Sequence, residues 1–180
     1  MRKILNIPTK EELIELNKRS EETHKFKYLK DTLEQNYTCL RGPRASGALL
    51  HIKYQEERVT KNGNRYIADV DEDIFGGVFP SKNSLSCKDK GECLIIDGHC
   101  KRNLHAEVDA IMNALLQGYK VKDSTLYSWN KPCYECSIFA IKAGVVRIVY
   151  RYVVYDEEKT QQAIQNAGII CEKYEVYIGE

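Results

Sequence analysis

Four residues near the middle of the chain have the types and the spacing that a metal-centred reaction needs. His105 and Glu107 are separated by one residue, and Cys133 and Cys136, which follow Pro132, form a Cys-x-x-Cys pair. Imidazole and thiolate are common zinc ligands, and a zinc site with three protein ligands keeps a fourth position for water. The histidine and the two cysteines are therefore predicted to hold a catalytic zinc ion, and the glutamate is left to carry protons.

The chemistry that suits this set is hydrolysis by an activated water. Zinc lowers the pKa of a bound water to about 7, which makes hydroxide available near neutral pH. The order His-x-Glu … Pro-Cys-x-x-Cys resembles the signature of zinc-dependent nucleobase deaminases. On this hypothesis hydroxide attacks C4 of a cytosine ring. Glu107 takes the water proton, passes it to ring N3 and later protonates the departing ammonia.

Other interpretations of the same residue types exist. A Cys-x-x-Cys pair alone is also typical of a redox centre or of half of a structural zinc site, and a lone histidine on a helix is usually structural. A closed structural site needs a fourth protein ligand. The joint pattern favours the catalytic site, because each half opens a predicted helix and thiolates are stabilised at a helix N-terminus.

The elements that must position these residues alternate along the second half of the chain. Helices are predicted at about 105–117, 133–143 and 156–167, each followed by a glycine. Strands are predicted at 125–129, 145–150 and 169–177. This alternation predicts an α/β protein with a mostly parallel sheet and helices on its faces.

The N-terminal region is predicted to be helical over about residues 9–36. Thr9 and Glu12 form a capping-box pattern at its start, and a break is expected near Ser20. An apolar stripe along this region is formed by Leu13, Leu16, Phe26, Leu29 and Leu33. The stripe predicts that one face of the helix packs on the rest of the domain.

A long hairpin and an irregular stretch follow this helical region. Residues 47–54 and 65–70 are predicted strands, with a turn at 61–64 between them. Residues 71–103 have no regular pattern. A loop of this length in a compact domain is usually functional or held in place by another group.

Size and composition limit the class of protein. The chain has 180 residues, 43% of them hydrophobic, which fits one domain over residues 1–180. Its 27 Lys and Arg nearly balance 26 Asp and Glu, whereas a dedicated nucleic-acid binder usually has a basic excess. No apolar run reaches membrane-spanning length, and the apolar part of the N-terminus is too short for a signal peptide.

These features predict a cytoplasmic protein that acts on a small molecule, with neither nucleic acid nor a membrane as its partner. The seven cysteines are an odd number. In a cytoplasmic protein they favour metal binding over disulfide bonds.

Beyond the zinc motif, the chain resembles the deoxycytidylate (dCMP) deaminase family of the cytidine deaminase-like superfamily. The resemblance covers about residues 38–172 and is most specific from residue 91 onward. It is carried by the stretch 91–107, by Thr125-Leu126-Tyr127, by Ala143-Gly144-Val145, and by Val149-Tyr150 with Tyr155-Asp156.

The resemblance implies a fold, a reaction and partners. The fold is the three-layer α/β/α cytidine deaminase-like fold with a five-stranded mixed sheet, and members are often homo-oligomers. The reaction is the zinc-dependent hydrolysis of dCMP to dUMP and ammonia. In many members dCTP activates and dTTP inhibits, so that Mg²⁺ bound with a nucleotide effector is a further expected cofactor.

Two departures from the family pattern fall where sugar and phosphate would be bound. Members usually carry Asn at the position of Asp109, and a Tyr-Asn-Gly turn where this chain has Ile74-Phe75-Gly76-Gly77. Alternatives to dCMP therefore stay open. They are another nucleoside or nucleotide, a base in nucleic acid, and a non-catalytic nucleotide-binding zinc module, against which the presence of Glu107 argues.

A second, structural zinc is known in some members near the substrate loop. Residues of this chain that could supply such a site are Cys39, Cys87, Cys93, His99 and Cys100. A second ion would hold the long irregular stretch in place. The alternative is that these cysteines are buried free thiols, which behave as small hydrophobic residues.

Four further residues are candidates for substrate binding. Arg41 and Arg44 could bind a 5′-phosphate, since guanidinium matches phosphate geometry, or could be solvated charges. Trp129 could line the pocket or belong to the core. Tyr155 belongs to one of the stretches that resemble the family.

Overall fold

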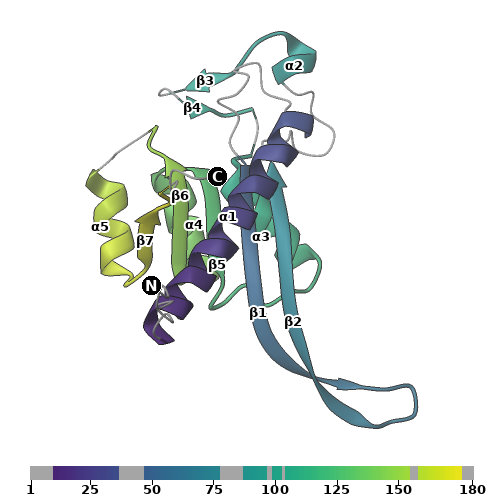
Figure 1. The fold of residues 1–180 in the computed structure, drawn as a ribbon. Helices are drawn as coiled ribbons and strands as arrows, with labels where there is room; N and C mark the ends of the chain where they lie inside the picture. The colour runs from purple at the N-terminus through teal and green to yellow at the C-terminus, as the bar shows by residue number, and fades with distance from the viewer. Residues whose placement is uncertain are drawn as a thin grey trace, which may run out of the picture.

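A five-stranded mixed sheet forms the centre of the fold (Figure 1). The computed structural model describes residues 10–36, 47–77, 87–96, 99–102, 104–154 and 158–175. The strands of the sheet are β1 (Gly47–Val59), β2 (Arg65–Gly77), β5 (Thr125–Asn130), β6 (Arg147–Tyr152) and β7 (Ile170–Lys173). Their order is β2-β1-β5-β6-β7. β1 is antiparallel to both of its neighbours, and β5, β6 and β7 are parallel.

Helices cover both faces of the sheet, which gives three layers (Figure 1). One face carries α3 (Ala106–Leu116), α4 (Tyr134–Ala143) and α5 (Glu158–Asn166), and the other carries α1 (Lys10–Asn36). The core cluster between the sheet and α3–α5 includes Leu50, Leu126 and Ile148. A smaller cluster, with Leu49 and Tyr127, packs under α1. The predicted α/β fold with a five-stranded mixed sheet is confirmed.

Helix α1 differs from its prediction in two ways. It runs without a break through Ser20, and Leu16 of the expected apolar stripe is 53% exposed. Phe26 and Leu29 are the members of the stripe that enter the core, while the side chains of Leu13 and Leu33 lie outside the described part of the chain. The N-terminal half of α1 is therefore held by something other than apolar packing.

Polar contacts provide that attachment. Arg147 of β6 contacts Glu22 of α1, and its Nε lies 2.6 Å from Glu172 Oε1 on β7. The hydroxyls of Thr23 and Tyr174 lie 3.0 Å apart. Helical periodicity predicts burial from apolar spacing alone, so it assigns Leu16 to the core and does not detect these ion pairs.

The irregular stretch expected at 71–103 contains regular structure. β2 continues through residues 71–77, paired with β1 down to Gly47 opposite Gly77. Asp71, Glu72 and Asp73 are exposed, which explains why no hydrophobic alternation marked this part of the strand. Farther on come the short helix α2 (Cys87–Lys90) and a small hairpin of β3 (Ile95–Ile96) with β4 (His99–Cys100).

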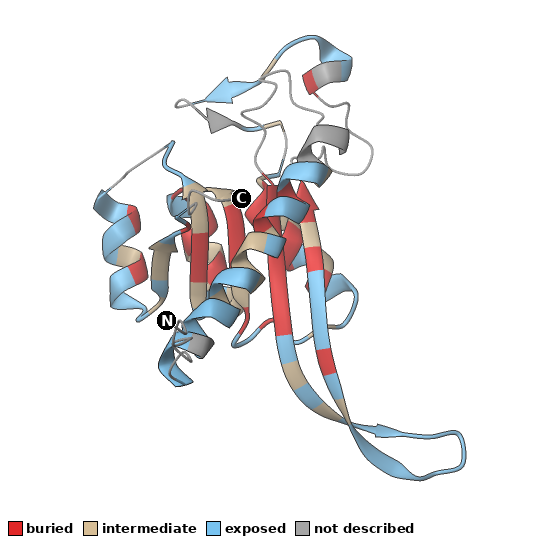
Figure 2. Ribbon diagram, viewed as in Figure 1, coloured by how far each residue is buried: buried red, intermediate tan, exposed pale blue. Residues whose placement is uncertain are grey.

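The distal halves of β1 and β2 form an arm that extends away from the rest of the molecule (Figure 1). β1 is buried from Gly47 to Ile52 and mostly exposed beyond that point (Figure 2). The turn of the arm contains Gly63 at φ +83°, as the predicted Asn-Gly turn requires. Within the described residues, no helix has the length and hydrophobicity needed to span a bilayer.

Candidate metal centre

The two halves of the zinc motif lie at the starts of neighbouring helices. His105 is the N-cap of α3 and Cys133 is the N-cap of α4, both with extended backbone. Pro132 is fully buried immediately before Cys133, a place where no backbone donor is lost. Both helices therefore present their N-terminal ends, which favour anionic ligands such as thiolate, toward one point.

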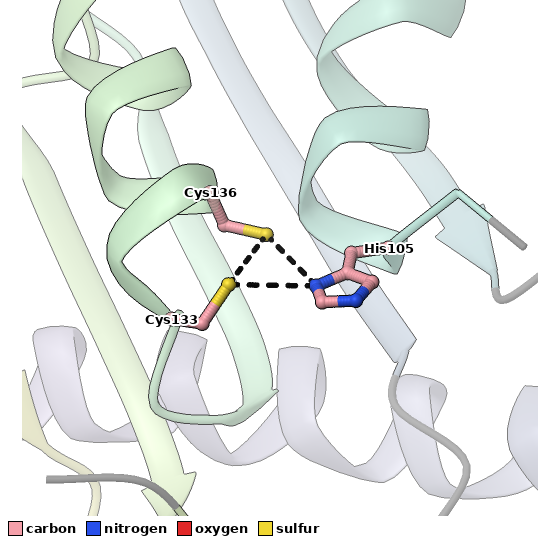
Figure 3. A group of neighbouring side chains, drawn as sticks. All are labelled: His105, Cys133 and Cys136. Carbon is pink, nitrogen blue, oxygen red and sulfur yellow. Dashed lines mark hydrogen bonds between the residues drawn. The ribbon is translucent and has the colours of Figure 1, made fainter. Parts of the chain in front are cut away.

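His105, Cys133 and Cys136 form a triangle of ligand atoms (Figure 3). His105 Nδ1 lies 3.5 Å from Cys133 Sγ and 3.3 Å from Cys136 Sγ, and the two sulfurs are 3.5 Å apart. Zinc bonds of about 2.0–2.3 Å at tetrahedral angles separate two ligand atoms by roughly 3.5–3.8 Å. The triangle is within a few tenths of an ångström of that size, so these three residues fit a zinc ion.

The same three side chains shift one another's pKa values. The pKa of Cys133 falls to about 3, mainly because the Cys136 thiol donates a hydrogen bond to its sulfur. That hydrogen bond, together with burial, raises the pKa of Cys136, and the contact with Cys133 raises the pKa of His105. One thiolate is therefore already favoured in this set, and a metal ion that binds there must displace the remaining protons.

Glu107 lies beside the triangle on the first turn of α3. It is 4% exposed, and its Oε2 lies 3.7 Å from Cys136 Sγ. Ser128 of β5 donates a hydrogen bond of 2.7 Å to the other carboxylate oxygen, Oε1. Burial raises the pKa of Glu107, and the hydrogen bond from Ser128 opposes that rise. The carboxylate is therefore poised both to accept and to release a proton near the ligand triangle.

Asp109, which stands where the family usually has Asn, faces the end of β2. Its Oδ2 accepts hydrogen bonds from the backbone N–H of Gly77 at 3.1 Å and from Asn113 Nδ2 at 3.2 Å. Asn113 also donates to the carbonyl oxygen of Phe75 at 3.3 Å. Asp109 and Asn113 thus attach the first turns of α3 to the last residues of β2.

The segment after β4 contacts the start of α4. Lys101 Nζ lies 3.0 Å and 3.1 Å from the two carboxylate oxygens of Glu135, the residue that precedes Cys136. This ion pair brings the region of the small β3–β4 hairpin next to the second half of the zinc motif. The pair is solvent-exposed on the Glu135 side, with 70% of that side chain accessible.

The predicted second metal set is only partly described. Cys87 is buried and Cys93 is partly buried, and neither forms a disulfide bond. Cys39 and the side chains of His99 and Cys100 lie outside the described residues. Among the residues that the structure describes, the one group of His, Cys, Asp or Glu with metal-binding geometry is the triangle of His105, Cys133 and Cys136. The second zinc site stays a prediction.

Of the predicted substrate-binding residues, Trp129 is the one that lies in the described part of the chain. Its ring packs with the core cluster under α1. The ring centroids of Trp129 and Tyr152 lie 5.5 Å apart in an edge arrangement, and the guanidinium carbon of Arg151 lies 5.0 Å from the Trp129 ring centroid. This places it on the opposite face of β5 from Ser128, which contacts Glu107. Arg41, Arg44 and Tyr155 lie outside the described residues.

Ser128 is the residue of this site that the sequence patterns did not indicate. A serine within a strand has no motif of its own. The available signal was the alternation of β5, because Leu126 belongs to the core on the α3 side and a residue two positions later faces the same way. Counting from Leu126 would have placed Ser128 opposite the start of α3.

Comparison with known families agrees with this geometry. The family described as "Cytidine and deoxycytidylate deaminase zinc-binding region" matches residues 29–152, which is more than half of the chain and includes the whole triangle. The chain belongs to this family. The expected family resemblance is thereby confirmed.

Parts of the chain are similar to curated proteins. The chain is 32% identical to ComE operon protein 2 of Bacillus subtilis (strain 168) over 104 residues, which is 57% of this chain and 54% of that protein. It is 32% identical to the deoxycytidylate deaminase of Enterobacteria phage T4 over 71 residues, or 38% of this chain and 36% of that protein. The chain thus matches about half or less of the length of these relatives.

Solved structures of the same fold cover most of the chain. The dCMP deaminase of cyanophage S-TIM5 in its apo form has a TM-score of 0.57 at 21% identity, over 86% of this chain and 97% of that one. Its complex with dCMP and dUMP has a TM-score of 0.55 at 22% identity, over 87% and 95% of the two chains. At these identities the likeness concerns the fold.

Proposed function

We propose that this protein is a zinc-dependent hydrolase that deaminates a cytosine nucleotide, with dCMP converted to dUMP and ammonia. The observation that carries the proposal is the triangle of one half-buried imidazole and two buried sulfurs, with the buried carboxylate of Glu107 beside it. Three protein ligands leave a coordination position for water, as catalytic zinc sites require. A purely structural site would use a fourth protein ligand.

His105, Cys133 and Cys136 would hold the zinc ion in this proposal. When bound, zinc supplies a water whose pKa is lowered to about 7, and hence a nucleophile at neutral pH. The residues of the chain determine the rest. Burial of the two cysteines excludes bulk water from the ligands, and the helix N-termini favour their thiolate forms.

Glu107 moves the protons. Its Oε2, on the side of Cys136, accepts the proton of the attacking water and delivers it to ring N3 of the cytosine. After the water oxygen has bonded to C4, the same carboxylate takes the remaining proton of that oxygen and passes it to the amine, which leaves as ammonia while the C4=O bond forms. Its raised pKa suits this double role, because an acid and base must hold and release a proton near the working pH.

The choice of dCMP rests on relatives rather than on a described pocket. Deoxycytidylate deaminases of phages T2 and T4 and of Saccharomyces cerevisiae align with parts of this chain, as does ComE operon protein 2. The balanced charge of the chain, with a net value of +1, supports a small nucleotide over a polymer. Asp109 in place of the family's usual Asn is the feature most able to change the substrate.

Assembly and regulation follow the same family pattern in this proposal. A homo-oligomer, activation by dCTP bound with Mg²⁺, inhibition by dTTP and a second structural zinc are the finer expectations. A cytoplasmic location belongs with them. Each can be measured on the purified protein or, for location, in cells.

The test is ammonia release by the zinc-loaded protein on dCMP, CMP, dCTP, deoxycytidine, cytidine and a cytosine-containing oligonucleotide, with and without dCTP and Mg²⁺. Turnover confined to dCMP, and lost in Glu107→Gln, is the expected result. Activity on another member of the panel, with none on dCMP, would transfer the proposal to that substrate. Wild-type turnover that persists in Glu107→Gln would refute the role of this carboxylate.

A further inference from the structure

A buried hydroxyl is attached to the carboxylate that moves protons. Ser128 is 0% exposed, and its Oγ donates a 2.7 Å hydrogen bond to Glu107 Oε1. We propose that Ser128 is a positioning residue that holds Glu107 in the orientation needed for proton transfer. This inference rests on the proposed function and names a residue that the zinc motif does not contain.

The support for Ser128 is rigid. Ser128 lies on β5, the central strand, and pairs with Ala48 of β1 on one side and Tyr150 of β6 on the other. The backbone that carries the hydroxyl is therefore held in the sheet by a neighbouring strand on each side, and does not belong to a loop. A group held on a central strand can position a functional side chain more accurately than one held on a loop.

The contact divides the two oxygens of Glu107 between two tasks. Oε1 accepts the hydrogen bond from the Ser128 hydroxyl, whereas Oε2 lies 3.7 Å from Cys136 Sγ, on the side of the ligand triangle. A hydroxyl has one proton to donate, so it fixes one carboxylate oxygen and leaves the other toward the reacting atoms. Without Ser128 the buried carboxylate would have other rotamers available, and the oxygen facing the triangle would no longer be defined.

A merely structural role is the competing explanation, because any buried carboxylate needs a hydrogen-bond partner. The two explanations differ in what they predict. A structural partner affects thermal stability and leaves turnover per folded, zinc-loaded molecule unchanged. A positioning residue lowers kcat while KM and zinc content stay near their wild-type values.

The decisive comparison is Ser128→Ala against Ser124→Ala. Ser124 is 1% exposed and lies immediately before β5, and its Oγ has no hydrogen-bond partner among the described residues. Its truncation therefore removes a buried hydroxyl of the same kind away from Glu107. We expect kcat of Ser128→Ala to fall by a factor of roughly 10 to 100, the range expected for a hydrogen bond to a charged group. We expect Ser124→Ala to keep wild-type kcat, and Ser128→Thr, which restores the hydroxyl, to recover much of the loss.

A second measurement does not depend on turnover. The infrared difference spectrum between wild type and Glu107→Gln isolates the carboxyl band of Glu107. Ser128→Ala should shift that band, and Ser124→Ala should leave it in place. An unshifted band in Ser128→Ala, or wild-type kcat in that variant, would overturn the inference. A wild type inactive on the whole panel would instead refute the proposed function, while the infrared shift would still report whether Ser128 orients Glu107.

Non-additivity provides the last check. In the Glu107→Gln background, Ser128→Ala should cause no further loss of kcat, because the group through which Ser128 acts has already been removed. A full additional loss in the double variant would mean that Ser128 acts elsewhere, and would also overturn the inference.

Discussion

Gly76 of β2 lies against the backbone of Ala106 at the start of α3, with no space for a side chain between them. A β-carbon at Gly76 would overlap the carbonyl oxygen of Ala106 and the backbone of Ala110. This close approach sets the position of the first turn of α3, and His105 and Glu107 lie on either side of Ala106. The sequence showed this glycine as part of an irregular stretch and of a departure from the family's Tyr-Asn-Gly turn. In the structure it supports the position of the helix that carries two residues of the candidate site.

Gly76→Ala should therefore damage the site without touching any ligand. The backbone of α3 must move, and overpacking of a buried contact destabilises by about 1–3 kcal/mol. We expect a lower melting temperature, measured by calorimetry, and a lower zinc affinity, measured by zinc titration. Glu72→Ala, at an exposed position of the same strand, is the control and should behave as wild type. Unchanged zinc affinity in Gly76→Ala would show that α3 can shift without moving its ligand.

Asp109→Asn is expected to stabilise the protein at neutral pH. Burial raises the pKa of Asp109, so its contribution to stability is complete below the unfolded pKa and is lost as pH rises through the folded pKa. The amide oxygen of Asn can accept the hydrogen bonds from Gly77 and Asn113 without a buried charge. Calorimetry should show the melting temperature of wild type falling relative to that of Asp109→Asn as pH rises above the unfolded pKa of Asp, about 3.9, and through the raised folded pKa of Asp109.

Glu72→Gln is the control for that pH profile, because it neutralises an exposed carboxylate on β2. It should show no comparable difference from wild type. If Asp109→Asn melts below wild type at pH 7, the charge of Asp109 stabilises the fold, and burial is not the governing effect. Assayed on the nucleotide panel, the same variant also shows whether Asp109 selects the substrate.

The zinc motif was predictable from sequence because its geometry is local. Each half lies at a helix start, and cap positions, the following glycine and the ligand spacing can be read within a few residues. His105, Cys133 and Cys136 were accordingly predicted as one set, and the structure brings them together. The same applies to the alternating strands and helices of the second half, where Gly144 ends α4 in the left-handed conformation.

Contacts between distant residues were not predictable in this way. Ser128 and Glu107 are 21 positions apart, and Arg147 and Glu22 are 125 apart. No periodicity connects such pairs, since they depend on how strands and helices stack in three dimensions. The exposed Leu16 in the predicted stripe has the same cause, because ion pairs and not apolar spacing attach that part of α1.

Acid should weaken the attachment of α1 to β2. Burial would raise the pKa of Asp73, but hydrogen bonds from His51 and Lys25 outweigh it and lower that pKa. A lowered carboxyl pKa gives stability above the unfolded pKa, which is lost as pH falls through the folded pKa. Lys25 Nζ lies 2.5 Å from Asp73 Oδ2, and the Asp73 side chain is 38% exposed. The pair is therefore expected to contribute about 0.2–1 kcal/mol.

Lys25→Met tests this expectation against Lys27→Met, which removes an exposed lysine from the same helix. At pH 7 Lys25→Met should melt up to about 4 °C below wild type, and Lys27→Met should not. The gap between Lys25→Met and wild type should close as pH is lowered below the unfolded pKa of Asp, about 3.9, and through the lowered folded pKa of Asp73, because the carboxyl group is then protonated in both proteins. A gap that persists in acid would mean that the lysine contributes through its apolar stem and not through Asp73.

Removal of zinc should lower the free energy of unfolding by an amount that depends on the zinc concentration relative to its Kd. A ligand that binds only the folded state at 100 times its Kd adds about 2.7 kcal/mol, or roughly 5–10 °C for a chain of this size. Chelation should therefore lower the melting temperature of wild type, and added zinc should restore it. Because zinc must displace protons from Cys136 and His105, this difference should shrink as pH falls.

Cysteine variants test whether the fall in melting temperature on chelation comes from zinc bound at the triangle of His105, Cys133 and Cys136. Cys133→Ser should lose one zinc per chain by elemental analysis and should no longer respond to chelation. Cys171→Ser, at a free cysteine on β7, should keep both properties. Cys93→Ser distinguishes the second site, because it lowers the zinc content of wild type only if a structural ion binds there. A chelation response that survives in Cys133→Ser would place the stabilising metal outside the triangle, since a zinc site reduced to His105 and Cys136 loses half of its thiolate charge.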